Sequence, residues 1–91
     1  MDNQLFKTDI EVNKAIESLR NDVKEILESE SKDYYSSKFI NMTKNFMYLQ
    51  QLNKHYNKGN AEYEEAKRLI ESINEKDSQF VEYFKQFVNE K

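Results

Sequence analysis

His55 is the only histidine among the 91 residues, and the chain has no cysteine. These counts exclude a histidine-rich metal site, a thiolate metal site and a cysteine nucleophile. A serine hydrolase would need His55 as its base, but no Gly-x-Ser-x-Gly elbow presents a nucleophile. We therefore expect His55 to be a solvated residue in the last turn of a helix, where its cation is favoured.

Pairs of glutamates are the other residues that could do chemistry. Glu28 and Glu30, and also Glu64 and Glu65, bring two carboxylates close together in sequence, as acid-base catalysis or calcium binding would require. No EF-hand spacing surrounds them, and adjacent glutamates on a helix usually face solvent. The sequence predicts no enzymatic activity, no metal, no cofactor and no small-molecule substrate.

The composition indicates long helices. The chain has no proline and one glycine, Gly59, so it lacks the residues that many short strands and tight turns require. No apolar stretch approaches the roughly 18 residues of a membrane span, and the N-terminus does not look like a secretion signal. The missing cysteines fit a reducing compartment, so we expect a cytoplasmic protein. Twelve lysines against two arginines, with ten asparagines, suggest an AT-rich coding sequence of bacterial or phage origin.

A first helix is predicted over about 9–29. Its apolar residues recur at intervals of four and three, which places them on one face, widened by Leu27: Val12, Ile16, Leu19, Val23 and Ile26. Thr8 and Glu11 have the spacing of a capping box, so we expect the helix to start there.

A second helix is predicted over about 33–57, after a polar stretch where the apolar spacing slips by two residues. Its stripe comprises Tyr35, Phe39, Met42, Phe46, Leu49 and Tyr56. We expect it to end where Gly59 adopts the left-handed conformation, with Asn60 capping the next helix.

The remaining segment, about 60–89, has two interpretations. The 3-and-4 spacing continues through Tyr63, Ala66, Ile70, Ile73, Asp77, Phe80, Phe84 and Phe87, and Asp77 is its one polar member. We favour a single helix, because the phase is preserved across Asp77. The alternative is a break in which Asp77 caps a fourth helix. The predicted fold is all-α: one domain over 1–91, an antiparallel bundle of three long helices, or four if the last breaks near Asp77.

Charge is distributed unevenly along the chain. Residues 1–30 carry a net charge of −4, residues 31–60 of +4 and residues 61–91 of −3, which sum to the overall −3. This distribution favours a central second helix whose lysines face carboxylates on its neighbours. The same lysines could bind nucleic acid, and this is our alternative function: Lys32, Lys38, Lys44, Lys54 and Lys58, beside His55. The absence of arginine from this segment and the acidic flanks argue against it.

Apolar residues outside the main stripe suggest a binding face. Ile40 and Met47 lie seven residues apart and so on one line of the second helix, with Tyr48 beside Met47. They either complete the core of a central helix or form a surface for a partner helix or a second copy. Tyr34, Tyr63 and Tyr83 are predicted at the rim of the core.

The function that we expect is stoichiometric. Small acidic helical bundles of this size resemble bacteriocin-immunity proteins and phage-encoded inhibitors in gross architecture, and this resemblance implies a regulator, an inhibitor or an immunity-type binder. We predict a protein that binds another protein, or itself as a homodimer, through Ile40, Met47 and Tyr48.

Overall fold

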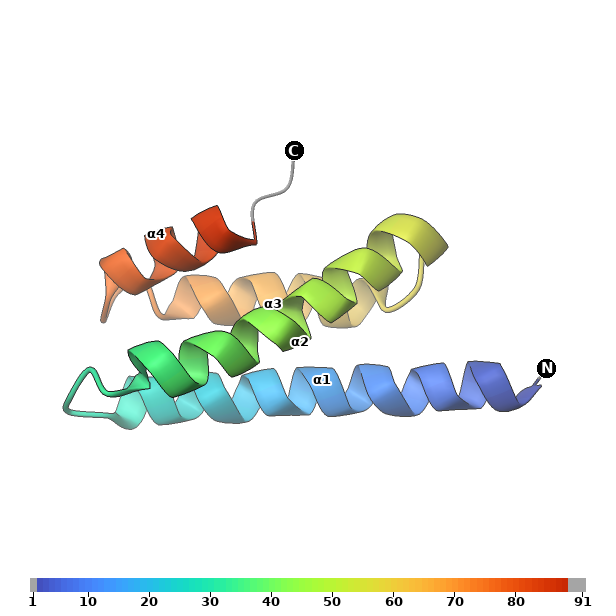
Figure 1. Ribbon diagram of the computed structural model, residues 1–91, viewed down its shortest axis with the longest axis horizontal. Helices are drawn as coiled ribbons and strands as arrows, with labels where there is room; N and C mark the ends of the chain where they lie inside the picture. Colours follow the sequence, from blue (N-terminus) through green and yellow to red (C-terminus); the bar gives the residue numbers. More distant parts are fainter. Residues whose placement is uncertain (1, 89–91) are drawn as a thin grey trace.

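The computed structural model describes residues 2–88, with side chains from Asp9 onward, and every regular element in this range is a helix. The four helices are α1 (Asp2–Glu28), α2 (Tyr34–Tyr56), α3 (Asn60–Ser72) and α4 (Ser78–Phe87), shown in Figure 1. The predicted all-α class is confirmed.

The start of α1 differs from the prediction. The helix begins at Asp2, so Thr8 lies inside it and not at its cap, and the side chain of Thr8 is outside the described part of the chain. No proline or glycine interrupts residues 2–8, and each added residue gains a backbone hydrogen bond once a helix exists. The predicted break after α1 is confirmed, because α1 ends at Glu28 and α2 begins at Tyr34.

The turn between α2 and α3 contains two residues in the left-handed conformation. Asn57 (φ 55°) is the C-cap of α2, and its N–H donates to the carbonyl of Asn53 at 3.1 Å. Gly59 (φ 67°) precedes α3 as its N-cap, and Asn60 is the first residue of that helix. The left-handed conformation predicted for Gly59 is confirmed, but the two cap residues lie two and one residues earlier than predicted, because asparagine also tolerates the left-handed region.

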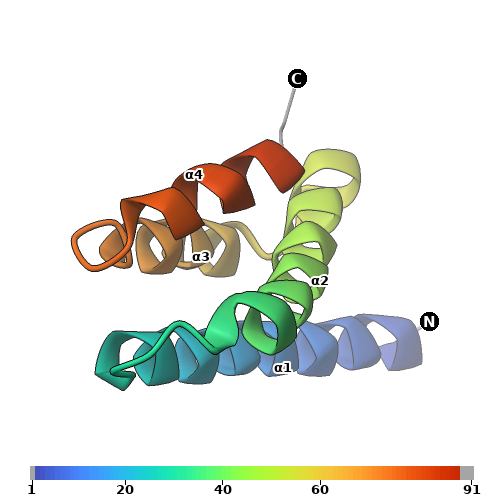
Figure 2. The same cartoon turned by 60° about the vertical axis from the view of Figure 1, so that its left-hand side comes forward.

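The single helix predicted over 60–89 is wrong. The chain turns between Ser72 and Ser78, and α4 doubles back along α3 (Figures 1 and 2). Asp77 caps α4, since its carboxylate accepts a hydrogen bond from the N–H of Phe80 at 3.1 Å. The apolar spacing survives the break because Ile73, in the turn, and Phe80, in the new helix, both point into the core and are fully buried.

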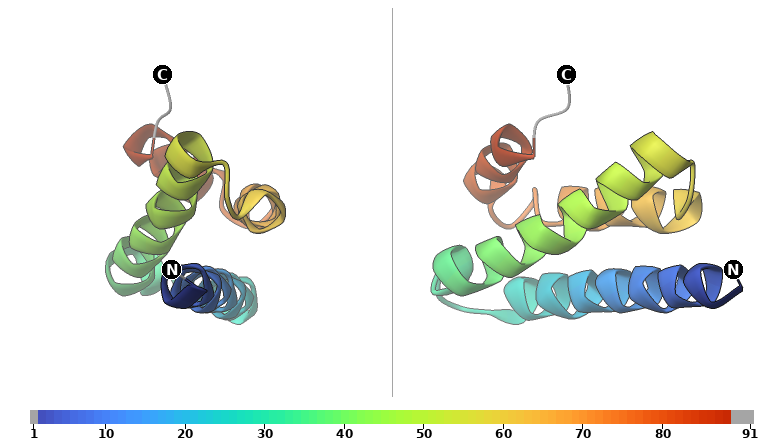
Figure 3. Two further views of the ribbon diagram at one scale, coloured as in Figure 1. Left: turned by 90° about the vertical axis from the view of Figure 1, so that its right-hand side faces the viewer. Right: turned by 45° about the vertical axis from the view of Figure 1, so that its right-hand side comes forward.

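The core lies along α2, which packs against α1, α3 and α4 (Figure 3). All five stripe residues of α1 are buried, as are Phe39, Met42, Phe46 and Leu49 of α2. Tyr34 and Tyr63 are buried and not at the rim. Three residues assigned to the stripes are instead exposed: Leu27, Tyr56 and Phe87. Each lies at or near the end of its helix, and the exposed ring of Phe87 still contacts that of Phe39 on α2.

One of the three lysines of α2, Lys38, meets carboxylates of another helix, so the predicted pairing of α2 lysines with neighbouring helices holds only in part. Lys38 forms ion pairs with Glu25 and, at 3.7 Å, with Asp22, both on α1. The hydrogen bond with Glu25 raises the pKa of Lys38 above its usual value. Arg20 and Glu65 form a bidentate pair at 2.6 and 2.8 Å between α1 and α3. These pairs set which helices are neighbours and add little stability at exposed positions.

Candidate protein-binding surface

Ile40 and Met47 lie on the side of α2 that no other helix covers. The side chain of Ile40 is 69% exposed and that of Met47 is 39% exposed. The core positions Phe39 and Phe46 directly precede them in sequence, so each is rotated by about 100° from the buried face. Of the two interpretations, the structure of the single chain fits the one that leaves Ile40 and Met47 on the surface.

The side chain of Tyr48 points toward α1 and not toward the uncovered side of α2. It is partly buried against the core, and its hydroxyl donates to Oε1 of Glu11 on α1 at 3.2 Å. Burial and this hydrogen bond raise the pKa of the Tyr48 hydroxyl. The structure therefore brings together two of the three predicted partner-binding residues, and Tyr48 belongs to the contact between α1 and α2.

The edge of α4 adds two aromatic residues to this side of the molecule. Tyr83 is 50% exposed and Phe87 is 59% exposed. Their rings pack on that of Phe39, with centroids 4.9 and 5.3 Å away. The opposite edge of α4 faces α3, where Lys85 forms an ion pair with Glu71. Tyr83 and Phe87 thus lie on the side of α4 away from α3, next to the uncovered side of α2.

We call Ile40, Met47, Tyr83 and Phe87 the outer apolar face. Phe87 was not predicted to be a surface residue, because its spacing placed it in the core stripe of a continuous helix. A usable signal was the width of the apolar arc in the last segment: Phe80, Val81, Tyr83, Phe84, Phe87 and Val88 span more of a helix than α2 and α3 can cover.

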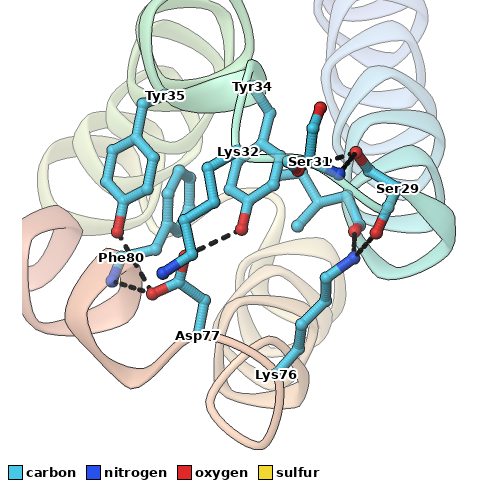
Figure 4. Close-up of polar contacts among 9 residues, drawn as sticks. Ser29, Ser31, Lys32, Tyr34, Tyr35, Lys76, Asp77 and Phe80 are labelled. Carbon is cyan, nitrogen blue, oxygen red and sulfur yellow. Dashed lines mark hydrogen bonds and ion pairs between the residues drawn. The ribbon is translucent and has the colours of Figure 1, made fainter.

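A polar cluster surrounds Asp77 (Figure 4), whose side chain is 2% exposed. Its carboxylate accepts hydrogen bonds from the hydroxyls of Tyr34 at 2.7 Å and Tyr35 at 3.1 Å, in addition to the N–H of Phe80. The ammonium of Lys32 lies 3.8 Å away. Burial acts to raise the pKa of Asp77, but the hydrogen bonds and Lys32 outweigh it and hold that pKa below its usual value.

The pKa values of Tyr34 and Tyr35 are raised, whereas that of Asp77 is lowered. Burial, followed by the hydrogen bond to Asp77, raises the pKa of Tyr34 to about 12, and the same causes raise the pKa of Tyr35. Both hydroxyls therefore stay protonated as donors, and the carboxylate stays ionised as the acceptor. A buried carboxylate with its lone pairs used in this way anchors α4 to α2.

Lys76, next to Asp77, closes the same end of the bundle (Figure 4). Its ammonium donates to the carbonyls of Ile26 at 2.5 Å and Leu27 at 3.4 Å, and also to the carbonyl of Ser29. These carbonyls lie at the C-terminal end of α1, where a cation is favoured. The turn between α3 and α4 is thereby fixed to the turn between α1 and α2.

Two of the residues considered for catalysis or metal binding, Glu64 and Glu65, form ion pairs with basic side chains. His55 is exposed in the last turn of α2, as predicted. Glu65 pairs with Arg20, which lowers the pKa of Glu65, and Glu64 pairs with Lys67 at 3.1 Å. Within residues 9–88, no three histidine, cysteine, aspartate or glutamate side chains are grouped to hold a metal ion.

One hollow of about 260 Å³ lies between α2, α3 and α4, with an apolar lining that includes Phe46, Tyr63, Ile70 and Phe84. Two larger hollows, of about 560 Å³ between α1 and α2 and about 400 Å³ between α1 and the start of α3, fall within the roughly 300–1,000 Å³ typical of ligand pockets. The helices of residues 2–88 include none with the length and apolar character needed to cross a bilayer.

Comparisons with protein families, with curated proteins and with solved structures find no match to this chain.

Proposed function

We propose that this protein binds another protein through the outer apolar face and performs no catalysis. The observation that supports this function is the exposure of four large apolar side chains, Ile40, Met47, Tyr83 and Phe87, on adjoining sides of two packed helices. Soluble monomers seldom expose such residues together unless a partner covers them. A role as a regulator, an inhibitor or an immunity-type binder in the cytoplasm fits this proposal.

The nucleic-acid alternative has less support. Lys38 is engaged by Glu25 and Asp22, and Lys32 lies beside Asp77, so phosphate would have to compete with carboxylates for two of the five lysines. The outer apolar face also offers a single polar group, the Tyr83 hydroxyl, for recognition of a base or phosphate.

The test compares the wild type with Met47→Glu and with Ile10→Glu. Met47 and Ile10 are each 39% exposed, but Ile10 lies on α1, so its substitution is a matched control. A partner retained from cell extract is identified, purified and titrated calorimetrically with each variant. We expect Met47→Glu to weaken binding by about tenfold or more, because it places a charge in an apolar contact, and Ile10→Glu to change it less than about twofold.

Circular dichroism establishes that both variants remain folded. Equal weakening by the two substitutions, or none by either, would show that the outer apolar face is not the binding surface. A salt-sensitive nucleic-acid ligand unaffected by Met47→Glu would favour the alternative function.

A further inference from the structure

Lysines are interleaved with the apolar residues on the uncovered side of α2. Ile40, Lys44, Met47, Gln51 and Lys54 follow one another at intervals of four, three, four and three, which places all five on one line of the helix. All five are exposed. A partner helix that covers Ile40 and Met47 therefore also covers Lys44, and one that continues about 10 Å along α2 reaches Lys54.

Lys44 and Lys54 form no ion pair with the described residues, although Glu11 on α1 lines the same hollow as Lys44. The 23 residues of α2 contain Lys38, Lys44 and Lys54 but no aspartate or glutamate. Lys38 is neutralised by α1, whereas no carboxylate of the described residues forms an ion pair with Lys44 or Lys54.

The edge of α4 that carries Tyr83 and Phe87 places no acidic residue beside the positive charge of Lys44 and Lys54. Gln79 and Gln86 lie beside Tyr83 and Phe87 on the helix surface. Glu82 is rotated by about 100° from Tyr83, toward the side of α4 opposite the core. The face as a whole is thus apolar with a positive margin, although the protein carries a net charge of −3.

A second copy of the chain fits this surface poorly. Lys44 lies between Ile40 and Met47, so a two-fold axis that paired these two residues with their counterparts would bring the two Lys44 ammonium groups together. Like charges placed opposite one another in an interface are strongly disfavoured. A partner that supplies carboxylates at these positions satisfies both the apolar and the charged groups.

We propose that the outer apolar face binds an acidic amphipathic helix of a different protein. This inference rests on the proposed function and specifies its partner. Ile40 and Met47 are about 10 Å apart along α2, which matches partner residues i and i+7, and Lys44 and Lys54 are about 15 Å apart. The bound helix presents an apolar stripe to Ile40, Met47, Tyr83 and Phe87, with carboxylates at its margin facing Lys44 and Lys54.

The experiment titrates the ¹⁵N-labelled full chain with two designed peptides. Each is an amphipathic helix of about 18 residues with leucine at i, i+3, i+4 and i+7, flanked by glutamate in one peptide and by lysine in the other. We expect the glutamate peptide to shift the amide resonances of residues 40–54 and 83–87. We expect it to bind at least about fivefold more tightly than the lysine peptide, with a preference that declines as salt is raised.

Charge reversal provides the decisive variant. Lys44→Glu with Lys54→Glu should invert the preference between the peptides. Lys24→Glu with Arg68→Glu is the matched control: both cations are exposed, they lie on α1 and α3, and the change in net charge is identical. The control should keep the wild-type preference, and circular dichroism should show that both variants are folded.

Each other outcome overturns the inference in a recognisable way. Equal binding of both peptides at residues 40–54 and 83–87 would refute the acidic partner and leave the proposed function standing. Shifts elsewhere, or none, would refute both. Two further results would assign the face to a different occupant: sedimentation showing a wild-type dimer that Met47→Glu abolishes, or binding to phosphatidylcholine–phosphatidylglycerol vesicles in preference to the glutamate peptide.

Discussion

The hydroxyl of Tyr34, the first residue of α2, donates a 2.7 Å hydrogen bond to the buried carboxylate of Asp77, which lies 43 residues further along the chain and caps α4. The Asp77 carboxylate thus caps the N-terminus of α4 and also joins α4 to α2. Because α4 carries Tyr83 and Phe87, this contact also determines which side of α2 remains uncovered. The position of the outer apolar face thus depends on a polar cluster at the end of the bundle.

Asp77→Ala should lower the free energy of unfolding by about 3–5 kcal/mol. The substitution removes an N-cap, worth about 1 kcal/mol, and leaves two hydroxyls without their acceptor, at about 1–3 kcal/mol for the buried Tyr34 and about 1 kcal/mol for the partly buried Tyr35. Asp77→Asn keeps a capping oxygen and should cost less, about 1–2 kcal/mol. Urea titration followed by circular dichroism measures both, and equal costs for the two variants would contradict the role of the carboxylate as an acceptor for several donors.

The free energy of unfolding should also decline in acid, because the Asp77 carboxylate becomes protonated. Its folded pKa is below the unfolded value of about 3.9, so the native state binds fewer protons than the unfolded state near and below that pH. The stabilisation is therefore fully present above about pH 5 and is lost as the pH falls through the folded pKa. Urea midpoints between about pH 6 and pH 2 should decline less steeply for Asp77→Asn than for the wild type. Parallel curves would contradict this assignment.

The raised pKa of Tyr34 predicts that the free energy of unfolding also declines at alkaline pH. Its folded pKa of about 12 lies above the unfolded value of about 10, so its contribution is present below about pH 10 and is lost as the pH rises toward 12. Each unit by which the pKa is raised corresponds to about 1.4 kcal/mol. Tyr34→Phe should lose less stability than the wild type over this range, as measured by urea unfolding at each pH. An identical alkaline loss in both proteins would show that Tyr34 does not titrate in this way.

A helix could be predicted from the sequence where its apolar residues recur at regular intervals and all face the core. The α1 stripe of Val12, Ile16, Leu19, Val23 and Ile26 is buried throughout, because periodicity reports directly which side of a helix is covered. The break after Glu28 was predictable for the same reason, since the phase slips there.

The turn at Asp77 could not be resolved by periodicity. Ile73 and Phe80 keep the spacing of one helix although the chain reverses between them, and the acceptor role of Asp77 depends on tyrosines more than 40 residues away. Without that turn the position of α4 is unknown. The sequence could therefore place Ile40 and Met47 on one line, but it could not show that Phe87 borders them or that Tyr48 faces Glu11.

Phe46→Ala should destabilise the protein by about 3–5 kcal/mol. The Phe46 side chain is buried, and its ring contacts those of Tyr63 on α3 and Phe84 on α4, so truncation leaves a cavity where three helices meet. Lys44→Ala, two residues away on the exposed side, should cost less than about 0.5 kcal/mol. Thermal and urea unfolding should separate the two variants clearly, and similar stabilities would mean that the faces of α2 are assigned incorrectly.

Lys76→Met should lower the free energy of unfolding by about 1 kcal/mol. The substitution keeps an apolar side chain of similar length but removes the donors to the carbonyls of Ile26, Leu27 and Ser29 and the cation at the end of α1. Lys67→Met is the control, because Lys67 forms only an exposed pair with Glu64 and a contact over the Tyr63 ring, and it should change stability by less than about 0.5 kcal/mol. Hydrogen exchange should show faster opening of the last turn of α1 in Lys76→Met alone. Equal exchange in both variants would indicate that Lys76 does not hold that end of the helix.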